Sequence, residues 1–121
     1  MAASIGTDYE VNTLGKVLFL EEVGEAPYRV DRMLCQLDAS GKLAQASGFL
    51  VGDLTDCDAR EGAPTLTCDE IVRQYLAGRG KPCISGIPAG HGRLNATLPM
   101  GVRVAVDADK GNVAFLERAV I

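Results

Sequence analysis

The sequence predicts an α/β domain with a mixed sheet, two main helices and a C-terminal β-hairpin. Three observations support this fold class. Short apolar runs alternate with two segments of helical apolar periodicity, each helical segment carries terminal signals, and the chain closes on a strand–turn–strand pattern. At 121 residues with 47% hydrophobic content, the chain is long enough to form one domain with its own core.

The first strand is expected at residues 16–20, an apolar run that follows Gly15 and ends at Glu21-Glu22. Pro27 suits the first turn of a helix, where its missing N–H costs nothing. Apolar side chains then recur at the i, i+3, i+4 and i+7 spacing of an amphipathic helix that ends near Ser40-Gly41. These apolar residues are Val30, Met33, Leu34 and Leu37.

A second strand is expected at residues 48–52 and a polar loop at residues 53–64. Thr67 and Glu70 have the spacing of a capping box, which begins a second helix. The expected buried stripe of that helix is Ile71, Val72, Tyr75 and Leu76.

A third strand is expected at residues 82–85, before a glycine-rich segment at residues 86–95. Residues 102–107 alternate apolar and polar side chains, and Asp109-Lys110-Gly111 turns the chain into residues 112–116. The chain is therefore expected to close with a β-hairpin.

Composition argues against several classes of partner. The net charge is −4 and no Lys/Arg cluster is present, which argues against nucleic acid. No basic region precedes an apolar one and the apolar runs are short, so we expect no signal peptide, no membrane span and a soluble, cytoplasmic protein. Cysteines lie far apart, with no C-x-x-C pair, and are expected to be free thiols rather than zinc ligands. They are Cys35, Cys57, Cys68 and Cys83.

Two groups of ionisable residues are candidates for a functional site, because ligands of open α/β sheets bind at the carboxyl ends of the strands. One is Glu21, with Glu22 and Glu25 close behind it. The other is His91, the single histidine, which lies between two glycines and is a candidate general base. A carboxylate bound to its far ring nitrogen would fix the tautomer. A surface histidine and a solvated glutamate are the structural alternatives, and spacing alone leaves them open.

A nucleophile for such a pair is missing from the sequence. None of the serines lies in a G-x-S-x-G elbow; they are Ser4, Ser40, Ser47 and Ser85. Cys83 belongs to an expected buried strand, where a thiol stays protonated. We therefore expect the nucleophile to lie outside this chain. A single histidine without neighbouring ligands gives no metal site, and no cofactor is implied.

The sequence resembles the carboxyl-terminal domain of LD-carboxypeptidases, the muramoyltetrapeptide carboxypeptidases, from about Gly15 to about Leu116. The matching segments, in the same order, are residues 18–34, 36–37, 41–43, 52–53, 90–91, 95–99 and 101. The resemblance implies a mixed-sheet β/β/α swivelling-type domain. Residues 2–7 resemble the segment that joins the two domains of that family. We therefore expect residues 1–14 to be an interdomain linker remnant, residues 15–121 to be the C-terminal domain, and the N-terminal nucleophile domain to be absent.

The resemblance implies a serine peptidase that removes the terminal D-alanine from cytoplasmic murein tetrapeptides in peptidoglycan recycling. In that family the serine comes from the N-terminal domain and the C-terminal domain gives the Glu and His of a Ser-His-Glu triad. These roles fall on Glu21 and His91, with Glu22 or Glu25 as alternative carboxylates. The chain alone would be inactive, and relatives are usually homodimers.

Two other functions remain open. One is a microcin-immunity peptidase of the same superfamily, which cleaves a peptidyl-nucleotide. The other is a non-catalytic binding or assembly domain. The residue that anchors the D-alanine carboxylate is also open among Arg29, Arg32 and Arg93.

Overall fold

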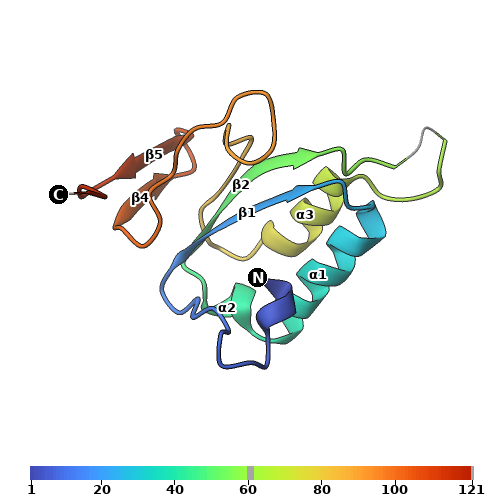
Figure 1. Cartoon of the computed structure of the whole chain (residues 1–121), viewed down its shortest axis with the longest axis horizontal. Coiled ribbons are helices and arrows are strands. Elements are labelled where there is room, and N and C mark those ends of the chain that lie inside the picture. Colours follow the sequence, from blue (N-terminus) through green and yellow to red (C-terminus); the bar gives the residue numbers. More distant parts are fainter. Residues whose placement is uncertain (60–61, 121) are drawn as a thin grey trace.

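The computed structural model describes residues 1–59 and 62–120 (Figure 1). A sheet of three parallel strands forms one layer and two long helices form a second layer packed on it. A small β-hairpin follows. In chain order the elements are η1 (Ala2–Ser4), β1 (Val17–Val23), α1 (Pro27–Ala39), α2 (Lys42–Gln45), β2 (Gly48–Thr55), α3 (Cys68–Leu76), β3 (Cys83–Ser85), β4 (Val104–Asp107) and β5 (Asn112–Phe115).

Both main helices begin where the sequence signals predicted, and α1 also ends there. Pro27 opens α1, and Gly41 adopts a left-handed φ of 78° just beyond its end. At α3 the capping box is complete. The Thr67 hydroxyl accepts from the Glu70 amide at 3.2 Å, and the Glu70 carboxylate accepts from the Thr67 amide at 2.8 Å. Local chemistry therefore determines both helix starts.

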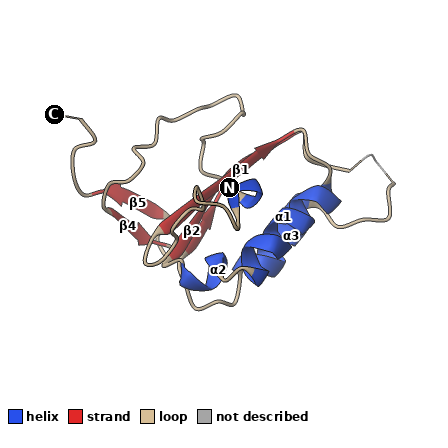
Figure 2. Ribbon diagram, turned by 60° about the horizontal axis from the view of Figure 1, so that its bottom comes forward, coloured by secondary structure: helices blue, strands red, loops and turns tan. Residues whose placement is uncertain are grey.

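The three-stranded sheet has the order β1-β2-β3, and α1 and α3 lie together on one of its faces (Figure 2). The core fills the space between this face and the two helices. Its buried side chains include Leu18, Phe49 and Val51 from the sheet, Val30, Leu34 and Leu37 from α1, and Ile71, Val72 and Leu76 from α3.

The first two strands are longer than the sequence predicted. Pairing of β1 with β2 continues through Glu22 opposite Leu54 and Val23 opposite Thr55, so the expected strand end at Glu21 and the expected loop start at residue 53 are wrong. Polar residues can continue these strands because their backbone N–H and C=O groups pair with the neighbouring strand, while their side chains are only partly buried. Residues 60–61 of the expected loop lie outside the described residues.

The α/β class, the two main helices and the C-terminal hairpin are confirmed, but the strands divide into two sheets. The strands β4 and β5 pair only with each other, antiparallel, from Val104 opposite Phe115 to Asp107 opposite Asn112. The hairpin borders a small pocket with Val17, Phe19 and Leu50 of the parallel sheet. It thus packs near the sheet without hydrogen-bonding to its edge.

The stretch before β1 contacts the domain. Thr13 is fully buried and donates its hydroxyl proton to the Lys42 carbonyl at 2.9 Å, and Ile5 packs against the core. That residues 1–14 are a linker remnant stays a prediction. All four cysteines are free thiols. Within the described ranges, no helix combines the length and apolarity needed to cross a bilayer.

Candidate active site

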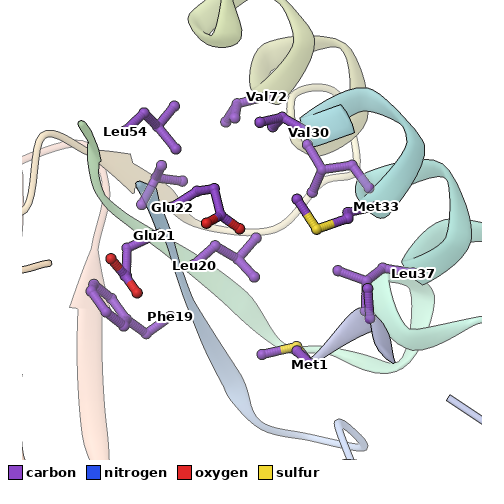
Figure 3. A pocket seen from close by; sticks show the side chains of 13 residues that line it. Met1, Phe19, Leu20, Glu21, Glu22, Val30, Met33, Leu37, Leu54 and Val72 are labelled. Carbon is purple, nitrogen blue, oxygen red and sulfur yellow. The ribbon is translucent and has the colours of Figure 1, made fainter. Parts of the chain in front are cut away.

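A β-bulge between β1 and β2 places Glu21. Leu20 pairs with Val51 but Glu22 pairs with Leu54, so Gly52 and Asp53 of β2 together face the single residue Glu21. Bulges re-aim side chains and are common beside active sites. Glu21 and Glu22 point to opposite sides of β1, as Figure 3 shows. Glu21 therefore lies on the face of the sheet that the helices do not cover.

The loop that carries His91 is attached to β2. The Ile87 amide donates to the Val51 carbonyl at 3.0 Å, and the Asp53 amide donates to the Ala89 carbonyl at 3.0 Å. These bonds extend the β2–β3 pairing beyond the end of β3. Gly52 permits the close approach, since a Cβ at this position would lie 2.2 Å from the Ala89 oxygen. The loop backbone is thus held directly above the bulge.

His91 and Glu21 meet across 70 positions of sequence, with His91 Nδ1 at 2.8 Å from Glu21 Oε2. When Nδ1 carries the proton and donates it to the carboxylate, Nε2 is left as an acceptor. The His91 side chain is 57% exposed and that of Glu21 is 28% exposed, so the imidazole remains open to a reacting group. Their arrangement is that of a general base with an orienting carboxylate.

The other two candidate glutamates have different neighbours. Glu22 lies on the helix side of β1, where it borders an open pocket of about 300 Å³ together with Met33 (Figure 3). Glu25 forms an ion pair with Arg29 at 3.0 Å. In the described part of the chain, Glu21 is the carboxylate that hydrogen-bonds to the imidazole.

Among the described residues, no nucleophile accompanies the pair. The Ser4 hydroxyl donates to Met1 O and the Ser40 hydroxyl to Leu37 O, and across residues 1–59 and 62–120 no hydroxyl or thiol hydrogen-bonds to the imidazole. Burial raises the pKa of the Cys83 thiol, which keeps it protonated. The same described ranges contain no cluster of three or more potential metal ligands.

The three candidate arginines lie on different elements of the structure. Arg29 and Arg32 belong to α1, which packs on the helix-covered face of the sheet, whereas Glu21, the partner of His91, lies on the other face. Arg29 is also paired with Glu25 and stacks over Tyr28 at 5.8 Å. Arg93 follows His91 by two positions and is exposed. It is the candidate on the same loop as the imidazole.

Asp53 is a site residue that sequence reasoning missed. Its carboxylate oxygen Oδ2 accepts a hydrogen bond from the Gly92 amide at 3.1 Å, next to His91. Its polar sequence context predicts a loop position and no role. The signal was available, because Asp53 follows an expected strand, and the rule that singled out Glu21 at a strand end applies equally to it.

Comparisons with known proteins agree with this architecture. A family model described as the LD-carboxypeptidase C-terminal domain matches residues 1–106. A putative carboxypeptidase of Synechocystis sp. is 38% identical over 112 residues, 93% of this chain and 37% of the relative. A probable murein peptide carboxypeptidase of Bacillus subtilis is 35% identical over 107 residues, 88% of this chain and 34% of the relative. The chain therefore spans about a third of the length of these relatives.

Two solved structures share the fold. Muramoyltetrapeptide carboxypeptidase from Oxalobacter formigenes matches with a TM-score of 0.72 and 32% identity, over 85% of this chain and 36% of that one. The microcin C7 self-immunity protein, which Escherichia coli carries, matches with a TM-score of 0.80 and 24% identity, over 98% of this chain and 35% of that one. The match of the family model over most of the sequence identifies the chain as a member of the LD-carboxypeptidase family, corresponding to its C-terminal domain.

Proposed function

We propose that this chain supplies Glu21 and His91 of a Ser-His-Glu triad that removes the terminal D-alanine from murein tetrapeptides. The observation that carries the proposal is the 2.8 Å hydrogen bond between His91 Nδ1 and Glu21 Oε2, which leaves Nε2 exposed. A hydrogen bond typically contributes only about 0.5–1.5 kcal/mol to stability. A catalytic role accounts for this pairing better than a structural one does.

The proposed reaction follows from the geometry. His91 Nε2 takes the proton of a serine hydroxyl as the oxygen attacks the carbonyl of the L,D peptide bond. The imidazolium that forms is stabilised by the Glu21 carboxylate, 2.8 Å from Nδ1. His91 then donates the proton to the nitrogen of the leaving D-alanine, and water repeats the sequence on the acyl-enzyme.

The serine is proposed to come from an amino-terminal nucleophile domain of the same protein. Two observations support this. No nucleophile meets the imidazole in the described part of the chain, and the matched segment covers only 34–37% of the relatives' length. In addition, parallel sheets are normally covered on both faces. The helices cover one face here, the hairpin and the His91 loop lie over part of the other, and the exposed imidazole leaves room there for a second domain (Figure 2).

The substrate class rests on relatives. The Bacillus relative is named as a probable murein peptide carboxypeptidase and the Oxalobacter structure as a muramoyltetrapeptide carboxypeptidase. We extend this to a role in peptidoglycan recycling in the cytoplasm, by a full-length protein that acts as a homodimer. The isolated chain is proposed to be inactive because it lacks the serine.

The test uses a two-domain protein in which this chain follows a nucleophile domain. Release of D-alanine from murein tetrapeptide should fall by about 10⁴-fold in Glu21→Gln and at least as far in His91→Ala. Glu25→Gln is the matched control, since this carboxylate pairs with Arg29 instead of His91. Unchanged hydrolysis in the first two variants would exclude the triad and favour a non-catalytic domain. A fluorophosphonate should label the two-domain protein and leave the isolated chain unlabelled.

A second candidate is a microcin-immunity-type peptidase of the same superfamily. The fold match to the microcin C7 self-immunity protein, over 98% of this chain, supports this second candidate. The same triad would then cleave a peptidyl-nucleotide. Parallel assays with murein tetrapeptide and with an aminoacyl sulfamoyl adenosine separate the two, because the preferred substrate shows the higher kcat/KM.

A further inference from the structure

We propose that Asp53 is a positioning residue that holds the His91 loop so that the imidazole stays on Glu21. Its importance for turnover rests on the function proposed above, whereas its effect on the ring can be measured without catalysis. Within the described ranges, Asp53 makes no hydrogen bond to His91 itself. It acts through the backbone on both sides of that residue.

Two hydrogen bonds from Asp53 bracket His91. The Asp53 backbone amide donates to the Ala89 carbonyl at 3.0 Å, on the amino-terminal side. The Asp53 carboxylate accepts from the Gly92 amide at 3.1 Å, on the carboxyl-terminal side. The second bond involves a charged acceptor, and such bonds are stronger than neutral ones. One strand residue therefore holds the loop at residue 89 and at residue 92, on either side of His91.

The glycines flanking His91 fit closely against the same carboxylates. A Cβ on Gly92 would lie 2.5–2.7 Å from three atoms of the Asp53 carboxyl group. A Cβ on Gly90 would lie 3.1 Å from Glu21 Oε2 and 3.3 Å from Asp53 Cβ. The Gly-His-Gly backbone therefore lies directly on the two carboxylates, and neither glycine can carry a side chain without displacing them.

The β-bulge explains why Asp53 lies close enough to bind the backbone of the His91 loop. The register shift sets Gly52 and Asp53 together opposite Glu21, so Glu21 and Asp53 approach the same loop from adjacent strands. Glu21 binds the imidazole and Asp53 binds the backbone that carries it. The Asn95 side chain also holds the loop on the amino-terminal side of His91, where its amide nitrogen donates to the Gly90 carbonyl at 2.9 Å. Asp53 supplies the bond on the carboxyl-terminal side, next to a mostly exposed ring, and a displacement of about 1 Å can cost on the order of 10²-fold in rate.

The ring itself provides the test, since His91 is the single histidine and gives one imidazole signal set. In the 121-residue chain, ¹⁵N ring shifts should show the Nδ1–H tautomer. The Asp53→Ala variant should lose this preference. Asp53→Asn should retain it, because the amide oxygen still accepts from Gly92. Asp109→Ala, which removes an exposed carboxylate of the hairpin turn, is the control and should leave the ring unchanged.

A wild-type ring spectrum in Asp53→Ala, or no recovery in Asp53→Asn, overturns the proposal. If Asp53→Ala does not fold, Gly92→Ala takes its place, because the added methyl group displaces the carboxylate without removing it. An unperturbed ring in Gly92→Ala then overturns the proposal as well.

Kinetics of the two-domain protein separate positioning from folding. Asp53→Ala should lower kcat by about 10²-fold with KM within about twofold, and Asp53→Asn should recover most of the rate. If Glu21→Gln and His91→Ala remain active, the proposed function fails while the ring measurement still stands. If those variants are inactive but Asp53→Ala keeps its kcat, the positioning role alone fails.

Discussion

Gly52→Ala tests whether the close approach of the His91 loop to β2 is required. A Cβ at this position would lie 2.2 Å from the Ala89 oxygen and 2.7 Å from Phe19 Cζ. The first of these is a backbone atom and cannot rotate away. The loop must therefore move off the strand, which breaks the 3.0 Å bond from the Asp53 amide to Ala89.

The expected cost follows from two contributions. Forcing an extra methyl group into a packed site typically costs about 1–3 kcal/mol. Loss of the Asp53 amide bond adds about 1 kcal/mol. We expect Gly52→Ala to lower the free energy of unfolding by about 2–4 kcal/mol, a large share of the roughly 5–15 kcal/mol of an ordinary domain.

Urea unfolding followed by circular dichroism measures this loss, and the ¹⁵N ring shifts of His91 report the site in the same samples. Gly48→Ala is the matched control, because it lies on the same strand and its Cβ would lie 3.1 Å from Pro82, a milder contact remote from the loop. We expect Gly48→Ala to lose less stability and to keep the ring spectrum. Equal stabilities of the two variants, or an unchanged ring in Gly52→Ala, would refute the reasoning.

Four further predictions concern individual side chains. Glu21→Gln should change the free energy of unfolding by less than about 1 kcal/mol, because the side-chain amide can still accept from a mostly exposed imidazole; a loss above about 2 kcal/mol in urea would indicate a structural role. Thr67→Ala should cost about 1 kcal/mol through loss of the helix cap. Hydrogen bonds with Thr67 lower the pKa of Glu70. The ionised Glu70 carboxylate should therefore stabilise the fold above pH 4.5, and this stabilisation should disappear as the pH falls below that value. The free energy of unfolding of the wild type and of Glu70→Gln, measured against pH, tests this. Exposed Cys35 should react with Ellman's reagent in the native chain at neutral pH. Buried Cys68, whose pKa burial raises to about 11, should react only on unfolding, and equal rates would contradict its burial.

The helices could be predicted from local sequence. Periodicity, Pro27 and the Thr67–Glu70 capping box predicted α1 and α3 correctly, because backbone and neighbouring side chains satisfy helix termini within a few residues. Strand ends were predicted less well. Glu21 and Asp53 belong to strands because of pairing between distant segments, which polarity along the chain does not reveal.

The candidate site, too, could be predicted only in part from the sequence. The sequence by itself determined that one histidine lies in a glycine-rich loop, that three glutamates compete to be its partner, and that the chain resembles a family with a divided triad. Only the tertiary structure decided which glutamate meets the ring. The β1–β2 bulge turns Glu21 towards His91, while the alternation of the strand sends Glu22 to the helix side and Arg29 engages Glu25. A pairing across 70 positions depends on sheet register, and register is a property of two segments together, which neither contains alone.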